Sequence, residues 1–154
     1  MFVLLLVIKA FGYPGDCVIQ YCFAGQQFPK AIQKLLLDHV TPQMQIYYEE
    51  SFGPVACIVR VRDVEEAITV ANDTEYGLSS AIFSRNVKVA MEIAERLDFG
   101  CCHINGPTVH DEAHMPLGGM KASGYGRFGG QPGIHEFTEV QWITIEDPKQ
   151  HYPI

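Results

Sequence analysis

Residues 56–105, ACIVRVRDVEEAITVANDTEYGLSSAIFSRNVKVAMEIAERLDFGCCHIN, decide the fold class. The apolar run from Ala56 to Val61 predicts a buried strand, and shorter apolar runs at 80–83 and 101–105 predict two more. Helical patterns separate the three predicted strands. Because strands that alternate with helices pair in parallel through right-handed crossovers, this stretch predicts an α/β layer.

Two helices are expected between these strands. Asp63 is placed to cap the first helix, and Glu66 follows three residues later as a capping-box partner. Asn86 is placed to cap the second helix, and Gly100 to end it. Apolar residues at helical spacing define the inner face of each helix. They are Val64, Ala67, Ile68 and Ala71 in the first, and Val87, Ala90, Met91, Ala94 and Leu97 in the second.

Composition restricts the class of protein. The chain has 154 residues, 47% of them hydrophobic, which suits one globular domain with a sizeable core. A formal charge of −7 and a pI near 5.2 argue against a nucleic-acid partner, because phosphate binding needs clustered Lys and Arg. Five cysteines without CxxC spacing indicate neither a disulfide framework nor a zinc ribbon. We therefore expect a reducing, cytoplasmic location.

The two ends of the chain give weaker patterns. Residues 1–33 have no clear period, although the apolar start from Phe2 to Ile8 suits a strand or a packing segment. That start is too short to cross a bilayer and lacks the features of a signal peptide, so no membrane partner is expected. Residues 106–133 are rich in glycine and proline and predict a long, tightly turned loop. Residues 137–145 alternate with apolar groups on both faces, which predicts a terminal strand that needs a partner.

Four separated motifs, in this order and spacing, resemble the aldehyde dehydrogenase superfamily from about Leu35 to Asp147. They are Glu49-Glu50-Ser51-Phe52-Gly53-Pro54-Val55, Ala71-Asn72 with Tyr76-Gly77-Leu78, Asn105, and the run from Pro116 to Arg127. The resemblance implies a three-layer αβα parallel-sheet catalytic-domain fragment with a C-terminal extended strand. It also implies oxidation of an aldehyde to a carboxylic acid with NAD or NADP in the complete enzyme, and assembly into a homo-oligomer.

The first motif suits the edge of a cofactor site. A carboxylate accepts hydrogen bonds from both hydroxyls of a ribose, and a neighbouring aromatic ring offers a flat apolar face. The resemblance assigns these roles at the nicotinamide ribose to Glu50 and Phe52. Without it, the same residues are better interpreted as a solvated acidic turn before a strand.

The glycine-rich motif from Gly118 to Arg127 invites a phosphate-loop interpretation, but its spacing fits neither Walker nor dinucleotide patterns. In the family this loop lies near the catalytic centre and packs against other parts of the enzyme. We therefore favour a packing role, with Lys121 and Arg127 as polar ties.

The segment between the last predicted strand and the glycine motif helps to form the aldehyde entrance in the family. The resemblance makes substrate-loop candidates of Val109, His110, Asp111 and Leu117. His110 and His114 are four residues apart, but a zinc helix places Glu directly after the first His, and Pro107 and Pro116 argue against a helix here. No metal site is expected.

The family attacks the aldehyde with a cysteine thiolate that follows Gly-Gln and one variable residue. Here Gly25-Gln26-Gln27 is followed by Phe28, and Cys22 precedes this element. Cys101 and Cys102 are expected to fill the core. No Glu-Leu-Gly-Gly motif supplies a general base, and no glycine-rich strand-to-helix turn marks a nucleotide-binding domain. We therefore expect no catalytic residue in this chain and doubt that it binds the cofactor alone.

Three hypotheses follow. The favoured one is an inactive fragment of an aldehyde dehydrogenase, divided into an atypical segment 1–33, a partial catalytic domain 34–136 and an oligomerisation strand and tail 137–154. The second is a non-catalytic assembly module that pairs with a full-length subunit through its terminal strand. The third is a hydrolase built on Cys101 or Cys102, for which His103 is a poor base because it points to the opposite face of the strand from Cys102.

Overall fold

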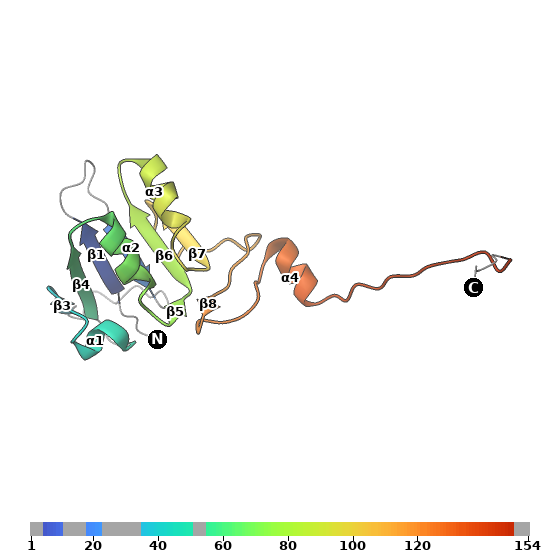
Figure 1. Ribbon diagram of the computed structural model, residues 1–154, viewed down its shortest axis with the longest axis horizontal. Helices are drawn as coiled ribbons and strands as arrows, with labels where there is room; N and C mark the ends of the chain where they lie inside the picture. Colours follow the sequence, from blue (N-terminus) through green and yellow to red (C-terminus); the bar gives the residue numbers. More distant parts are fainter. Residues whose placement is uncertain (1–4, 11–17, 23–34, 51–54, 150–154) are drawn as a thin grey trace, which may run out of the picture.

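A computed structural model describes residues 5–10, 18–22, 35–50 and 55–149 (Figure 1). Its main sheet has six strands in the order β3-β4-β1-β2-β6-β7, and a small second sheet pairs β5 with β8. The strands are β1 (Leu5–Ala10), β2 (Val18–Cys22), β3 (Leu35–Leu37), β4 (Val55–Val61), β5 (Tyr76–Gly77), β6 (Ser79–Phe83), β7 (Cys101–Ile104) and β8 (Met120–Lys121). The helices are α1 (Gln45–Tyr48), α2 (Val64–Asn72), α3 (Val87–Ala94) and α4 (Gly130–Glu136).

The three strands predicted from residues 56–105 all form, as β4, β6 and β7. β3, β4 and β1 are mutually parallel, as are β6 and β7. β2 runs antiparallel to both of its neighbours, β1 and β6, so that β6 again points the same way as β4. The predicted α/β fold is therefore confirmed, with β2 as the one antiparallel member of the main sheet.

The start of the chain contributes to the centre of this sheet. The strand expected near the N-terminus forms as β1, and it pairs with β4 on one side and β2 on the other. β2 in turn pairs with β6. Strands β1 and β2 thus join the same sheet as β4, β6 and β7, and they lie between β4 and β6 (Figure 1).

Helix α2 follows the prediction closely. The Asp63 side chain accepts a hydrogen bond from the backbone N–H of Glu66 at 2.9 Å, as an N-cap does. In a capping box the Glu66 carboxylate would accept a hydrogen bond from the backbone N–H of Asp63. Here it accepts from the backbone N–H of the preceding residue, Arg62, at 2.8 Å. On the inner face Ala67, Ile68 and Ala71 are buried.

Helix α3 corrects two expectations. Asn86 caps it as predicted, by accepting from the backbone N–H of Val89 at 3.2 Å. The inner face is rotated, however: Ile93 is buried beside Ala90, whereas the predicted Val87 and Met91 are 55% and 49% exposed. The helix also ends at Ala94, well before Gly100.

Gly100 has another role. A Cβ atom at Gly100 would lie 1.7 Å from the carbonyl oxygen of Gly118. Since no side chain tolerates such a contact, glycine is needed where these two backbones meet, and not to end the helix.

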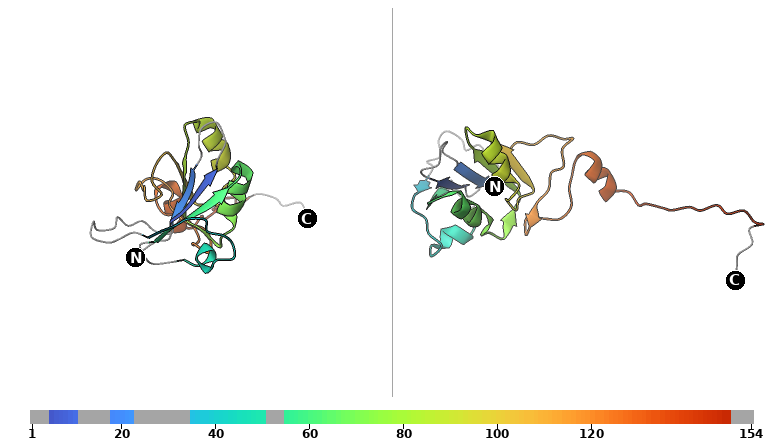
Figure 2. Two further views of the ribbon diagram at one scale, coloured as in Figure 1. Left: turned by 90° about the vertical axis from the view of Figure 1, so that its left-hand side faces the viewer. Right: turned by 45° about the horizontal axis from the view of Figure 1, so that its top comes forward.

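One helical layer of the predicted three-layer arrangement is visible. Helix α2 packs against β1, β2 and β4, and α3 packs against β6 and β7. Both crossovers, β4-α2-β6 and β6-α3-β7, progress in the same direction along the sheet, so right-handed connections place both helices on the same face (Figure 2). Among the described residues no helix packs on the opposite face.

The C-terminal region differs from the expectation of a strand. Most of 106–129 is the predicted loop, interrupted by β8, and it leads into α4, which was not predicted. From Phe137 the chain runs away from the sheet in extended form (Figure 1), and Phe137–Ile145 makes no β pairing within the described residues. A strand needs hydrogen bonds to a neighbour, and none is available in this part of the chain. No described helix is long and apolar enough to cross a membrane.

Candidate functional site

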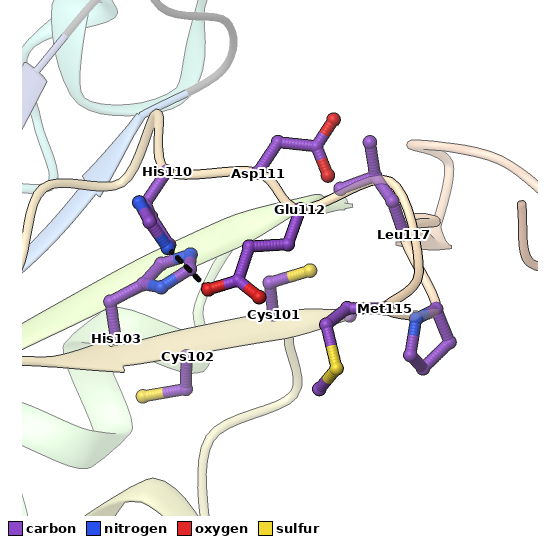
Figure 3. A pocket seen from close by; sticks show the side chains of 10 residues that line it. Cys101, Cys102, His103, His110, Asp111, Glu112, Met115 and Leu117 are labelled. Carbon is purple, nitrogen blue, oxygen red and sulfur yellow. Dashed lines mark hydrogen bonds and ion pairs between the residues drawn. The ribbon is translucent and has the colours of Figure 1, made fainter. Parts of the chain in front are cut away.

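A cavity of about 340 Å³ lies between strand β7 and the segment that follows it in sequence (Figure 3). Strand β7 supplies one wall, and the loop folds back over it to supply the other. The lining residues are Gly100, Cys101, Cys102, His103, His110, Asp111, Glu112, Met115, Pro116 and Leu117.

Three of the four substrate-loop candidates meet at this cavity. His110, Asp111 and Leu117 line it, whereas Val109 is not among the lining residues and is 53% exposed. The structure therefore brings together the candidates that the resemblance placed in one loop, apart from Val109.

One carboxylate holds two imidazoles at the rim of the cavity. Nε2 of His110 lies 3.1 Å from Oε1 of Glu112, and Nε2 of His114 lies 3.2 Å from Oε2 of the same residue. All three side chains are about half exposed or more. Within the described residues no group of three or more His, Cys, Asp or Glu side chains is arranged to hold a metal ion.

His103 is a site residue that the sequence offered only as a poor base for Cys102 and not as a cavity residue. It lines the cavity from β7, and its ring meets that of His110 edge to face, with centroids 5.8 Å apart. The Nε2 atom of His103 is buried and has no hydrogen-bond partner among the described residues. Burial lowers the pKa of His103, and the neighbouring His110 lowers it further, so the neutral ring is favoured. Alternation along a strand was the available signal, since it places His103 on the face of Cys101.

The two cysteines of β7 lie on opposite sides of the strand. In Figure 3, Cys101 and His103 point toward the loop, whereas Cys102 points away, which agrees with the expected geometry. Burial raises the pKa of the Cys102 thiol, which reduces its nucleophilicity at neutral pH. Among the described residues no hydrogen bond joins a cysteine thiol to a histidine ring. The arrangement gives no support to a hydrolase that uses these thiols.

Asn105 connects the ends of β6 and β7. Its side-chain Oδ1 accepts from the backbone N–H of Ser84 at 2.9 Å, and its Nδ2 donates to the carbonyl of Ser84 at 3.0 Å. Its backbone has a φ of 57°, which asparagine tolerates better than most residues. Asn105 thus fixes the point at which the chain leaves the sheet for the cavity loop.

The glycine-rich motif packs against the sheet region through backbone contacts and through Lys121. Nζ of Lys121 donates to the carbonyls of Asn72 and Thr74, at 3.0 and 3.1 Å. A guanidinium nitrogen of Arg127 donates to the carbonyls of Gly119 and Gly126, at 2.9 and 2.7 Å. Lys121 is confirmed as a polar tie to the end of α2, whereas both acceptors of Arg127 lie within the motif, so this cation stabilises the loop itself. Both cations donate to backbone oxygens and are not arranged around an anion site.

Glu50 is half-buried and lies near Tyr76 at the start of β5. Glu75 raises the pKa of Tyr76 most, and the charge of Glu50 adds to the shift. Phe52, the other cofactor candidate, lies outside the described residues, as do Gly25, Gln26 and Phe28.

Comparison with known proteins matches the sequence profile of the aldehyde dehydrogenase family to residues 22–143. The chain belongs to the aldehyde dehydrogenase family. The match begins before residue 34, where the sequence alone first indicated a catalytic domain. The matched range includes all residues that line the cavity, and both Gly100 and Gly118.

The relatives of this aldehyde dehydrogenase chain are much longer than the chain itself. A vanillin dehydrogenase of Pseudomonas sp. strain HR199 is 58% identical over 123 residues, which is 80% of this chain and 26% of that protein. The crystal structure of a salicylaldehyde dehydrogenase from Pseudomonas putida G7, complexed with salicylaldehyde, is 50% identical with a TM-score of 0.74, over 77% of this chain and 25% of that one. The crystal structure of a succinic semialdehyde dehydrogenase from Streptococcus pyogenes, in complex with NADP+, is 39% identical with a TM-score of 0.68. The match covers 73% of this chain and 24% of that one. The chain thus spans about a quarter of the length of these relatives.

Proposed function

We propose that this chain forms the substrate-side part of an aldehyde dehydrogenase that oxidises an aromatic aldehyde to the carboxylic acid with NAD or NADP. The cavity between β7 and residues 110–117 carries this proposal, because it joins an apolar end to a polar one. The similarity to a vanillin and a salicylaldehyde dehydrogenase supports an aromatic substrate.

We also propose that these 154 residues do not catalyse the reaction alone. The family chemistry needs a thiolate that adds to the aldehyde carbon, and the resulting thiohemiacetal then gives a hydride to NAD or NADP. No cysteine follows Gly25-Gln26 at the family spacing, and this pair lies too close to Glu50 to be the family's nucleophile motif. Cys101 lies on the cavity wall without a histidine partner among the described residues, and the thiol of Cys102 has a raised pKa. The cysteine and the general base would therefore come from outside this sequence.

Glu50 and Phe52 are proposed to contact the nicotinamide ribose in the complete enzyme. The half-buried position of Glu50 before β4 suits a carboxylate that meets a ligand at the edge of the sheet. Its hydrogen-bond acceptors match two vicinal hydroxyls, whereas Phe52 would supply apolar contact. The free thiols of Cys57, Cys101 and Cys102 suit the reducing cytoplasm proposed for this protein.

A chimera tests the proposed function. Residues 35–149 replace the matching part of the Pseudomonas vanillin dehydrogenase, and NAD(P)H formation is measured with benzaldehydes and with short aliphatic aldehydes. We expect turnover with a preference for the aromatic aldehydes, and no turnover from the 154-residue chain by itself. A chimera that folds but prefers aliphatic aldehydes would contradict the substrate class.

The chimera also separates the cofactor role from the substrate role. Glu50→Gln removes the charge but keeps the shape, and it is expected to raise the KM for the cofactor without changing the ranking of aldehydes. Glu95→Gln is a matched control, because Glu95 lies at the C-terminal end of α3, away from the cavity lining. Equal effects of the two substitutions would remove Glu50 from the proposed cofactor site.

A second candidate function is assembly with a full-length subunit. The tail from Phe137 to Ile145 exposes Val140, Trp142 and Ile145 by 95%, 88% and 95%, and it finds no partner within the described residues. An extended segment with apolar groups on both faces is suited to join the edge of another subunit's sheet. Homo-oligomers, or complexes with a full-length relative, are the expected forms.

Light scattering tests this candidate. The chain is measured alone and mixed with the full-length Pseudomonas vanillin dehydrogenase, and a Trp142→Glu variant serves as the comparison. We expect association that the substitution abolishes, because a carboxylate would replace apolar contact at the buried interface. A stable monomer under both conditions would rule the assembly role out.

A further inference from the structure

We propose that His103 recognises a ring hydroxyl of a phenolic aldehyde, through its Nε2 atom at the polar end of the cavity. This inference rests on the proposed function, because it assumes that an aromatic aldehyde enters the space between β7 and residues 110–117. It adds a subclass of substrate, hydroxylated benzaldehydes, and the residue that selects it.

The cavity has two chemically different ends. Met115, Pro116 and Leu117 provide apolar surface at one end, where a benzene ring can pack. His103 and His110 lie together at the other end, with their rings edge to face (Figure 3). A ligand that fills both ends needs a flat apolar body and a polar substituent on it.

His103 has an unmet hydrogen-bonding requirement. Its Nε2 atom is buried and has no hydrogen-bond partner in the part of the chain that the structure describes, although buried polar atoms are almost always paired. A neutral imidazole nitrogen either donates or accepts, and a phenol hydroxyl does both, so the pair matches in either tautomer. A benzaldehyde without a ring oxygen leaves the nitrogen unpaired.

His110 lies against His103 and, in the proposed site, limits access to its Nε2 atom. The two rings meet edge to face, and Nε2 of His110 lies 3.1 Å from Oε1 of Glu112. The His110 side chain is 56% exposed, so it can rotate toward solvent at low cost. The ligand hydroxyl then takes the place of the covering ring and pairs with His103.

Ligand binding to the 154-residue chain tests the inference without requiring turnover. Benzaldehyde and 3- and 4-hydroxybenzaldehyde are titrated into the wild-type chain, His103→Leu and His103→Gln, with the imidazole nitrogen signals followed by NMR. We expect His103→Leu to weaken binding of a hydroxybenzaldehyde about tenfold and of benzaldehyde less than about twofold, as for loss of one hydrogen bond. His103→Gln, which keeps a polar group, is expected to recover part of the loss. His39→Gln is the matched control, because His39 is 74% exposed and does not line the cavity.

The three ligands separate the inference from the function beneath it. One outcome is that benzaldehyde binds and shifts the NMR signals of Met115 and Leu117, while His103→Leu weakens binding of hydroxybenzaldehydes no more than that of benzaldehyde. In that case the aromatic site stands and the role of His103 is overturned. If neither class of ligand shifts the lining residues, the proposed aromatic cavity fails, and the inference fails with it. His110→Ala supplies an independent check, since removal of the covering ring is expected to strengthen binding of hydroxybenzaldehydes, and unchanged or weaker binding contradicts the proposed cover.

Discussion

Residues 55–105 and residues 106–149 differ in how far each region satisfies its own contacts. In the first region Cys57, Ala71 and Ile82 are fully buried, and the helix N-termini are capped by side chains of their own chain. In the second region, large apolar side chains such as Val140 and Trp142 are almost fully exposed. The first region, together with β1 and β2 that lie between its strands β4 and β6, therefore has the features of a folding unit, whereas the second has those of an interface.

The cavity forms where the two regions meet, at Asn105 and the loop that follows it. Asn105 ends the self-contained region, and the loop after it returns to cover β7 without a core of its own. A segment with few buried apolar contacts and much solvent-exposed surface opens easily and changes conformation readily on binding. A cavity placed at such a join has one rigid wall and one adaptable wall.

The largest predicted effect comes from the same truncation made in each region. Ile82 in β6 is fully buried, so Ile82→Ala is expected to lower the free energy of unfolding by about 2–5 kcal/mol. Ile145→Ala removes the same atoms from a residue that is 95% exposed and is expected to change it by less than about 0.5 kcal/mol. Urea unfolding followed by circular dichroism, at a concentration that keeps the chain monomeric, measures both. Comparable losses for the two variants would show that the tail packs in solution and would break the contrast.

A smaller but still large effect is expected at the join. Asn105→Ala removes two hydrogen bonds to Ser84 and places alanine at a φ of 57°, which together cost about 2–3 kcal/mol. Asn105→Gly loses the same bonds but tolerates the backbone, so it is expected to lie between alanine and the wild type in thermal unfolding. An alanine variant as stable as the glycine variant would mean that the backbone conformation contributes nothing there.

The fold of the first region could be predicted because its local signals agree with its tertiary contacts. Asp63 and Asn86 cap the helices that their positions predicted, and the apolar run of β4 is a strand. The inner face of α3 was predicted less well, since its sequence is apolar nearly all round and offers Val87 and Met91 as readily as Ile93. The central place of β1 and β2 could not be predicted, because pairing order depends on long-range contacts and not on local pattern.

The site was predicted in part. Residues His110, Asp111 and Leu117 came from resemblance to a family motif, and their chemistry alone would not have marked them. His103 was missed as a cavity residue because an isolated histidine in a strand carries no signal until its unpaired Nε2 atom is seen. The tail alternates as a strand does, but sequence pattern cannot supply the partner that a strand requires.

An effect of about 1 kcal/mol is expected at the first cap. Asp63→Ala removes the hydrogen bond to the backbone N–H of Glu66 and is expected to lower the free energy of unfolding by about 1 kcal/mol, measured by urea unfolding. Asp63→Ser keeps a capping oxygen and is expected to recover most of it. In the second region Asp147 accepts a similar backbone bond from Lys149, yet Asp147→Ala is expected to leave stability unchanged because the tail is exposed. A loss at Asp147 equal to that at Asp63 would indicate that the tail is ordered against the sheet.

The smallest predicted effect is a pH dependence at the boundary between the regions. Burial lowers the pKa of His103, so the unfolded chain binds a proton at a higher pH than the folded chain does. Stability is therefore expected to fall as the pH drops through about 6.5, the ordinary histidine value, and the loss ends below the lowered folded pKa. In His103→Gln the urea midpoint is expected to change less between pH 7.5 and 5.5 than it does in the wild type. An unchanged slope in His103→Gln would mean that the loop does not cover β7 in solution, and the boundary between the two regions would then lie at Asn105 with no cavity beside it.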